Sequence, residues 1–419
     1  MFACGSGLPL PSDFLFGAST SAHPTEGGNT ASDWWHLEHG DAAPVPEPSG
    51  DAADSYHRWP ADLDLLAELG FTDYRFGIEW ARIEPAPGHI SRAAVAHYRR
   101  IVDGALDRGL RPMVTLHHFT LPRWFADRGG WRAPDAVDRF ARYAAATAPI
   151  IGDDVRHVCT LSEPNLVAAL PTAAAVPSPR PPLPDQAPTD PALTDPALAD
   201  PALTEVLVRA HAAATAAVKE ASPAVRTGWS VASRACQAVP GAEEAMAAYR
   251  HTREDVFLEA ARGDDWIGVQ AGTRTRIGRQ GPLPVPEGAE VTLGGSEYYP
   301  AALGEALRHT ASVVGDVPII VTGNGIATND DGRRITYTRR ALEDLALALS
   351  DGLDIRGYLH GSALDGYEWG SYRPTSGLIA VDPHTFLRVP KPSARWLGRI
   401  ARTGILPWPA GSTSERSAG

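Results

Sequence analysis

The feature that most constrains the fold of this chain is a regular alternation of short β-branched runs with longer amphipathic segments. Eight runs have the composition of buried strands, at residues 14–19, 72–78, 111–117, 156–162, 225–231, 265–270, 317–323 and 355–361. Helical periodicity fills most of the intervals, as at residues 62–70, 92–109, 134–152 and 338–352. Strands that alternate with helices form parallel sheets, and eight of them predict a closed (β/α)8 barrel.

A doubly wound parallel sheet is the main alternative to the barrel. No predicted strand is followed by the glycine-rich fingerprint of a dinucleotide site or by a P-loop. The chain has 419 residues and is 43% hydrophobic, which is enough for one large core. The sequence therefore predicts a single α/β domain, a TIM barrel over residues 9–405, and a disordered tail at 406–419.

One segment, residues 171–204, departs from this pattern because it is rich in proline. It contains "DPAL" three times, beginning at Asp190, Asp195 and Asp200. Proline at this density is incompatible with a long helix or a central strand, so we interpret the segment as an extended or mobile loop. Since it follows the fourth predicted strand, it is expected on the C-terminal face of the barrel, as a tolerated insertion or as a lid.

Charge and hydrophobicity exclude two classes of binding partner, and the cysteine content indicates the redox state of the chain. The net charge is −12, no basic stretch is interleaved with aromatic residues, and no apolar run has the length of a membrane span. Nucleic acid and membrane are therefore not expected as partners. The first residues lack the pattern of a signal peptide, which favours a cytoplasmic location. Three scattered cysteines are expected to be reduced and structural: Cys4, Cys159 and Cys236.

No motif for a cofactor or a metal ion is present. The cluster "WWHLEHG" brings together His36, Glu38 and His39, but the spacing does not match a metal-binding helix, and a solvated loop is the preferred interpretation. Chemistry by side chains alone, with neither cofactor nor metal, is expected.

Six segments carry a resemblance to a known family. They are "FLFGASTSAHPTEGG", "DSYHRWPADLDLLAELGFTDYRFGIEWARIEP", "MVTLHHFTLPRWFADRGGW", "TLSEPN", "VTGNGIAT" and "LDGYEW…GLIAVD…RVPKPSARW". In this order they resemble glycoside hydrolase family 1, and the resemblance covers nearly the whole chain. It implies a (β/α)8 barrel and a retaining β-glycosidase, in which two carboxyl groups about 5 to 5.5 Å apart serve as acid/base and nucleophile.

The two catalytic positions of the family are occupied differently here. The family's "NEP" motif reads "SEP", so Glu163 matches the acid/base. The "TENG" motif reads "TGNG", which places Gly323 where the nucleophile would stand. Because glycine has no side chain, it cannot attack an anomeric carbon.

Four further positions also depart from the family. Pro24 replaces a glutamine and Ser162 an asparagine, both of which bind sugar hydroxyls in the family; Gly272 replaces the tyrosine that supports the nucleophile. Gly361 replaces the tryptophan that lies under the sugar. Five departures together indicate natural divergence and predict a pocket that is wider and less polar than a monosaccharide requires. Several family positions are retained: Arg75, His118, Glu163, Glu368 and Trp369.

The remaining residues suggest acid/base chemistry. A glutamate without a neighbouring carboxylate ionises more readily, so Glu163 is suited to act as a general base, with His118 as a second proton carrier. Arg75, which loses its nucleophile partner, would bind an acidic group or a developing enolate. Residues expected to line the ligand site are Ser162, Asn165, Gln270, Gly272, Gly323, Gly361, Glu368 and Trp369.

These observations predict elimination of water from a hydroxylated natural-product intermediate, such as a polyketide or tetramate. The chain is similar in this respect to the glycosidase-like dehydratase of tirandamycin-type antibiotic pathways. Three alternatives remain: a non-catalytic ligand-binding protein, hydrolysis assisted by an amide of the substrate, and an inactivated mutant at Gly323. Asp330 and Asp331 lie in a loop of turn composition, and we expect them to face solvent rather than to replace the nucleophile.

Overall fold

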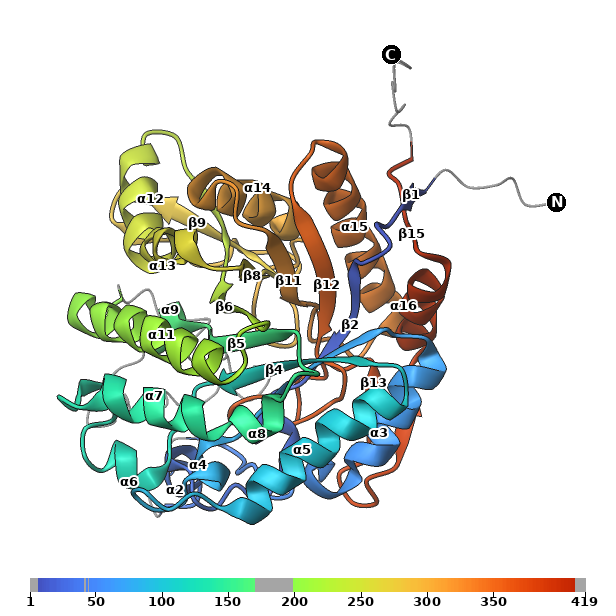
Figure 1. The fold of residues 1–419 in the computed structure, drawn as a ribbon. Coiled ribbons are helices and arrows are strands. Elements are labelled where there is room, and N and C mark those ends of the chain that lie inside the picture. The colour runs from blue at the N-terminus through green and yellow to red at the C-terminus, as the bar shows by residue number, and fades with distance from the viewer. Residues whose placement is uncertain (1–6, 41–42, 44, 170–198, 411–419) are drawn as a thin grey trace.

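The barrel predicted from the alternating pattern is present. The structure is a computed structural model that describes residues 7–40, 43, 45–169 and 199–410 (Figure 1). Eight parallel strands close on themselves in the order β11-β12-β2-β3-β4-β5-β6-β8. These strands coincide with the eight predicted runs: β2 (Leu15–Ser19), β3 (Asp73–Gly77), β4 (Arg111–His117), β5 (His157–Ser162), β6 (Arg226–Ala232), β8 (Trp266–Gln270), β11 (Ile319–Asn324) and β12 (Ile355–Gly361). The predicted fold class is confirmed.

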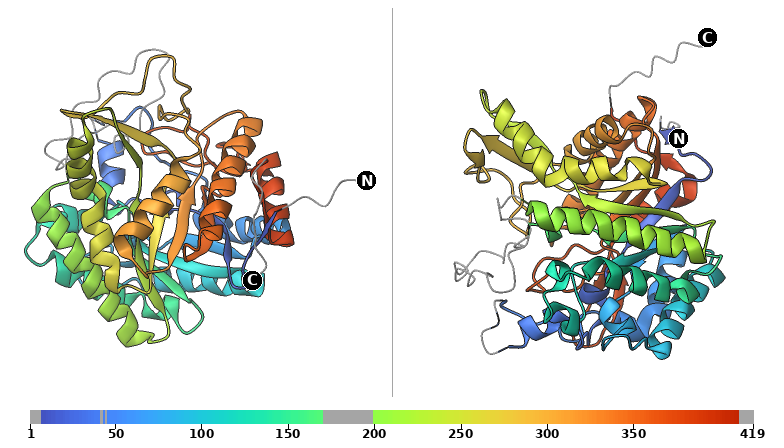
Figure 2. Two further views of the ribbon diagram at one scale, coloured as in Figure 1. Left: turned by 90° about the horizontal axis from the view of Figure 1, so that it is seen from above. Right: turned by 60° about the vertical axis from the view of Figure 1, so that its left-hand side comes forward.

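Helices lie outside the strands, as Figures 1 and 2 show. The longer ones are α3 (Ser55–Leu69), α5 (Arg92–Asp107), α7 (Ala136–Ala146), α11 (Pro201–Ala221), α12 (Glu243–Arg250), α14 (Ala302–Val314), α15 (Asp331–Ser350) and α16 (Pro392–Thr403). The shorter ones are α1 (Ala22–Glu26), α2 (Asp33–Glu38), α4 (Trp80–Ile83), α6 (Arg123–Ala126), α8 (Ala148–Ile151), α9 (Pro164–Val167), α13 (Val256–Ala260), η1 (Gly130–Arg132), η3 (His251–Asp255) and η4 (Ala261–Gly263).

The apolar residues of the strands are buried on both faces, which explains why the strand runs are continuously hydrophobic rather than alternating. Most of them pack against the helices in one large cluster. A separate cluster of six buried residues, one from each of six strands, fills the interior of the barrel: Leu15, Met113, Cys159, Trp266, Ile320 and Leu359. The barrel is thus a packed core that holds its C-terminal rim rigid.

Among the described residues, three small sheets lie outside the barrel, and none of them was predicted. They are β7 (Ala235–Ala238) with β9 (Arg274–Gly278) and β10 (Gly281–Pro282), β13 (Ile379–Val381) with β14 (Arg388–Pro390), and β1 (Leu8–Pro9) with β15 (Ile405–Leu406). Their strands are two to five residues long and partly polar, so they carry little periodic signal in the sequence. The residues just before β7 and β9 line the candidate site.

The predicted boundaries of two segments need correction. Most of the proline-rich segment lies outside the described residues, but Pro201–Ala221 is a helix, so the loop does not extend to residue 204. Asp200 caps this helix, since its side chain accepts from Ala202 N at 2.9 Å, and proline is favoured in the first helical turn. The predicted tail also begins too early, because Leu406 is buried in β15.

Candidate active site

The ends of the barrel strands enclose a cavity of about 330 Å³. Its lining residues come from the C-terminal ends of the barrel strands and from the segments that follow them. This is the end at which (β/α)8 enzymes carry their active sites, and the volume lies within the range of small-molecule pockets. The cavity is therefore the candidate active site.

Most of the predicted site residues meet at this cavity. Nine of the eleven line it: Arg75, His118, Glu163, Gln270, Gly272, Gly323, Gly361, Glu368 and Trp369. Ser162 and Asn165 do not, because both are fully buried. Asn165 instead holds the backbone of Ala232, donating to its carbonyl at 2.9 Å and accepting from its N–H at 3.0 Å. Its predicted role in ligand binding is replaced by a structural one.

Glu163 and His118 form a pair at the rim of the cavity. His118 Nε2 lies 3.2 Å from Glu163 Oε2, and the two side chains are each 17% exposed. Glu163 adopts a left-handed conformation, with φ of 56°, and so do two other lining residues, Phe119 at 65° and Trp369 at 48°. Residues with side chains rarely adopt this conformation, and where they do they cluster at functional sites.

Arg75 lies at the floor of the cavity and is 3% exposed. It donates to Thr115 Oγ1 at 2.9 Å, to the carbonyl of Thr322 at 3.1 Å and to Ser162 Oγ at 2.8 Å. Among the described residues no carboxylate lies within ion-pair distance of Arg75, so its neutral partners satisfy its hydrogen bonds but not its charge. A buried guanidinium in this setting favours an anionic group in the cavity.

Gln270 occupies the space that a side chain at position 323 would need. A Cβ added to Gly323 would lie 2.6 Å from Gln270 Oε1 and 3.2 Å from its Cδ, so the Gln270 side chain would have to shift. The Gln270 amide is fixed there because Nε2 donates to Ser162 Oγ at 3.0 Å. Gln270, from the neighbouring strand β8, therefore takes the space that a side chain at position 323 would enter.

Glycines widen the wall formed by β8, β11 and β12. A Cβ on Gly361 would have its closest contact at 3.5 Å, with the Cα of Gly323, so a side chain would find room there. Gly272 and Gly325 continue the same wall. Nine of the lining residues are serine or threonine. These hydroxyl groups can bind oxygen-rich ligands.

Trp369 anchors the opposite side of the cavity through aromatic contacts. Its ring stacks on His23 at 5.4 Å and meets Trp34 at 4.8 Å and Phe119 at 5.0 Å. The neighbouring Glu368 accepts a hydrogen bond from Ser376. Both predicted residues therefore lie at the cavity in a fixed arrangement.

The cluster "WWHLEHG" is not a solvated loop throughout. Residues 33–38 form α2, and Glu38 is buried, 2.9 Å from His23 Nε2, while His36 and His39 are exposed. The prediction of a solvated loop is wrong for Glu38, because the sequence does not reveal its partner His23, 15 residues earlier. Within the described ranges, no group of three or more His, Cys, Asp or Glu side chains is arranged so that it could bind a metal ion.

Asp330 and Asp331 hold structural positions away from the cavity. Asp330 caps α15, and Asp331 pairs with Arg334 and Ser393. Neither is among the residues that line the cavity. Within the described part of the chain, no helix combines the length and the apolar character needed to cross a membrane.

Sequence reasoning missed several lining residues, among them Phe119, Arg234 and Asn324. Arg234 follows β6 by two residues and Phe119 follows β4 by two. Their position just beyond a barrel strand could have identified them, because such residues surround the active site in this fold. The lining residues at 292–296 come from the long segment after β10, where the sequence offers no comparable signal.

Comparison with known proteins gives a consistent result. The family model described as glycosyl hydrolase family 1 matches residues 7–264 and 286–404. Thermostable beta-glucosidase B of Thermobispora bispora is 31% identical, over 94% of this chain and 91% of its own length. The solved structure of beta-glycosidase BGL167 is 42% identical with a TM-score of 0.85, covering 97% of this chain and 99% of that one. The solved structure of beta-glucosidase 1317 is 39% identical with a TM-score of 0.83, covering 95% of this chain and 99% of that one. This chain belongs to glycosyl hydrolase family 1.

Proposed function

We propose that this chain catalyses the elimination of water from a hydroxylated substrate, with Glu163 as the acid/base. The observation that carries the proposal is the combination of a retained Glu163–His118 pair with a nucleophile position that has no side chain and is filled by Gln270. Proton transfer needs only the Glu163–His118 pair, whereas retaining hydrolysis also needs a second carboxylate as the nucleophile.

Hydrolysis of β-glucosides is the activity suggested by the names of the relatives. Among the described lining residues the carboxylates are Glu163 and Glu368. Glu368 is held by Ser376, on the segment that carries Trp369, and does not stand at the end of β11, where the family's nucleophile belongs. The covalent step of a retaining glycosidase therefore has no candidate residue at its usual position.

The arrangement supports a mechanism in which the proton is carried between two neighbouring groups. The Glu163 carboxylate removes a proton from a carbon next to a carbonyl group, and the guanidinium of Arg75 stabilises the negative charge that develops on the carbonyl oxygen. Protonated His118 gives its proton to the hydroxyl group that leaves from the adjacent carbon, and the product is an alkene and water. Because His118 and Glu163 are 3.2 Å apart, the proton on Glu163 can then return to His118.

The lining of the cavity supports a proposal for the substrate class. A wall of glycines leaves room for a group broader than a sugar ring, and serine and threonine hydroxyls can bind several oxygen atoms. A hydroxylated polyketide or tetramate intermediate combines these features with an acidic carbonyl system that Arg75 can bind. Such a substrate belongs to natural-product biosynthesis, and antibiotic formation is the proposed setting.

The first test is incubation of the purified protein with two panels, hydroxylated polyketide or tetramate compounds and aryl β-glycosides, followed by mass spectrometry. We expect the loss of 18 mass units, the mass of water, from a member of the first panel. Glu163→Gln should reduce this turnover at least about 100-fold, the lower end of the contribution of a general acid/base. Glu259→Gln, at a half-exposed glutamate on α13, is the matched control and should leave the rate unchanged.

Two results would contradict the proposal. Release of aryl alcohol that depends on Glu163 would mean that a sugar site operates without its usual nucleophile. Tight binding of compounds of the first panel without any turnover would identify a binding protein.

A further inference from the structure

A hydrogen-bond acceptor without a protein donor lies at the cavity beside Gly323. Gln270 Nε2 donates to Ser162 Oγ at 3.0 Å, but among the described residues no group donates to Gln270 Oε1. This oxygen lies 2.6 Å from the point where a Cβ of residue 323 would stand, and both residues line the cavity. A carbonyl oxygen that loses its water without gaining a donor is unfavourable, so a ligand here is expected to supply a donor.

Arg75 supplies a donor without a protein acceptor at the floor of the same cavity. A guanidinium group carries five N–H groups. Among the described residues, acceptors meet four of them: Thr115 Oγ1 on Nε, the Thr322 carbonyl on Nη1, and Ser162 Oγ and Cys159 Sγ on Nη2. The second N–H of Nη1 is left for a ligand, which is expected to supply an acceptor.

Ser162 holds this donor and this acceptor next to each other. Its Oγ accepts from Arg75 Nη2 at 2.8 Å and from Gln270 Nε2 at 3.0 Å, and the serine itself is fully buried. Because the guanidinium and the amide bind the same oxygen atom, they are neighbours in a fixed arrangement. The cavity therefore presents the N–H of one residue beside the carbonyl oxygen of the other.

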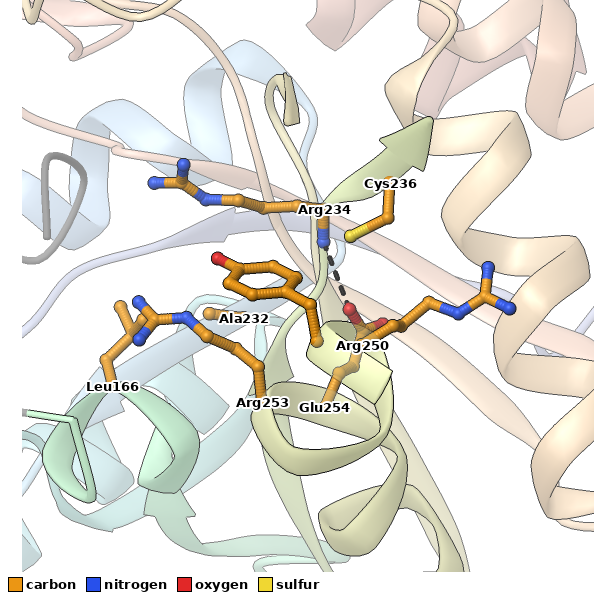
Figure 3. Close-up of a pocket in the computed structure, with 8 residues that line it drawn as sticks. Leu166, Ala232, Arg234, Cys236, Arg250, Arg253 and Glu254 are labelled. Atoms are coloured by element: carbon orange, nitrogen blue, oxygen red, sulfur yellow. Dashed lines mark hydrogen bonds between the residues drawn. The ribbon is translucent and has the colours of Figure 1, made fainter. Parts of the chain in front are cut away.

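The large cavity is the place where a ligand can meet this pair. A second pocket, which shares the lining residues Leu166, Ala232 and Arg234 with the cavity, has a volume of about 10 Å³ (Figure 3). This is room for about one water molecule. The cavity itself, at about 330 Å³, has room for a small ring with its substituents.

A neighbouring donor and acceptor fit a ligand group that carries an acceptor beside a donor. A cyclic amide has this pattern, because the amide of a small ring is cis and directs its N–H and its carbonyl oxygen to the same side. A hydroxyl group fits less well, since it offers one oxygen atom without charge. The carbonyl oxygen of an ionised tetramate ring shares the negative charge of the ring, which strengthens a hydrogen bond from a guanidinium group.

We infer that the substrate binds through a lactam ring, whose N–H donates to Gln270 Oε1 and whose carbonyl oxygen accepts from Arg75. Of the two substrate classes proposed above, this selects the tetramate, which has an amide in its ring, over a polyketide without nitrogen. That the ring belongs to a substrate rests on the proposed function; the preference of the cavity for a ring N–H does not.

Binding of ring analogues, measured by calorimetry, tests this preference without requiring turnover. The probes are acetyltetramic acid, its ring-oxygen analogue acetyltetronic acid, and N-methyl acetyltetramic acid, all of which are ionised at neutral pH. The wild-type protein should bind acetyltetramic acid at least about tenfold more tightly than the other two, because these leave Gln270 Oε1 without a donor.

Substitution of Gln270 tests which residue reads the N–H. Gln270→Met removes the acceptor and keeps an unbranched side chain against Gly323, so acetyltetramic and acetyltetronic acid should bind within about threefold of each other. Gln280→Met, at an exposed glutamine between β9 and β10, is the matched control and should keep the full preference. Arg75→Gln should weaken both acids at least about tenfold, since it removes the cation. Thermal midpoints of the variants show whether each one is folded.

Several results would overturn the inference: equal binding of the three probes by the wild-type protein, a preference that persists in Gln270→Met, tighter binding of acetyltetronic acid, or no binding at all. Glu163→Gln separates the two proposals, because it should abolish turnover and keep the preference between the rings. If the rings are discriminated but no hydroxylated compound loses water, the inference stands and the proposed function fails. If a polyketide without nitrogen loses water and the rings bind alike, the proposed function stands and the inference fails.

Discussion

At the scale of the residue, the packing of Gln270 against Gly323 shapes one wall of the cavity. Gln270 reaches into the space above Gly323 and is held by Ser162, which also accepts from Arg75. A carboxylate at position 323 would have to displace this amide and break its hydrogen bond. The packing around position 323 is thus adapted to a glycine.

A double-mutant cycle measures this packing. Gly323→Ala should lower the free energy of unfolding by about 1–3 kcal/mol, because the new methyl group overlaps the Gln270 amide. In a Gln270→Ala background the same change should cost at least about 0.5 kcal/mol less, since the obstructing side chain is gone. Urea denaturation of the four proteins checks the cycle. Equal costs in both backgrounds would show that Gln270 does not fill the space.

At the scale of the element, local sequence decides where helices begin on the catalytic side of the barrel. The third "DPAL" repeat starts α11, because Asp200 caps the first turn and Pro201 occupies a position where its missing N–H is not needed. Asp330 does the same for α15, accepting from Gly332 N at 2.9 Å and from Arg333 N at 3.2 Å. Residues that suggested loop or turn in the sequence are thus helix caps.

The cap of α15 can be tested by substitution. Asp330→Ala should lower the free energy of unfolding by about 1 kcal/mol, since two backbone N–H groups lose their acceptor. Asp330→Asn is the matched control, and a loss of only a few tenths of a kcal/mol is expected because an asparagine side chain caps nearly as well. Chemical denaturation with circular dichroism measures both. If both variants lost the same free energy of unfolding, the effect would come from the charge of Asp330 and not from its hydrogen bonds to the helix N-terminus.

At the scale of the whole molecule, buried ionisable groups set the response to pH. Burial lowers the pKa of His117 and His360 to about 3, and that of His97 and His157 to about 4, from 6.5. It raises the pKa of Glu26, Asp33 and Glu254 to about 7. Below pH 6.5 the unfolded chain therefore binds more protons at the histidines, which reduces stability. As the pH falls from about 7 to 4.5, the folded chain binds more protons than the unfolded chain at the three carboxyl groups. This uptake increases the stability of the folded state and largely offsets the loss caused by the histidines.

We therefore expect stability to change little between pH 7 and 4.5 and to fall steeply below pH 4.5, where the carboxyl groups are protonated in both states. His117 packs edge-on against Trp131 at 5.2 Å, so His117→Phe preserves an aromatic ring there. The variant should gain stability relative to wild type by about 1.4 kcal/mol for each pH unit between pH 6 and pH 4, the effect of one proton. Urea denaturation across this range is the measurement. Parallel pH profiles for the two proteins would contradict the buried neutral state of His117.

The sequence by itself determined the barrel, all eight of its strands, and nine of the eleven predicted residues that line the cavity. The strands were predictable because each strand run is continuously apolar. The cavity residues were predictable because the resemblance to glycoside hydrolase family 1 marks the matching positions, and Glu163, Gly323 and Gly361 lie at or next to the C-terminal ends of barrel strands, where the fold directs them to the cavity.

Only the tertiary structure decided which groups are partners. Asn165 proved to be buried against Ala232, Glu38 against His23, and Gln270 above Gly323, because each contact joins segments 15 to 67 residues apart and leaves no local pattern. Periodicity reports which side of an element is buried, whereas the partner that a buried polar group meets is fixed by how the elements pack.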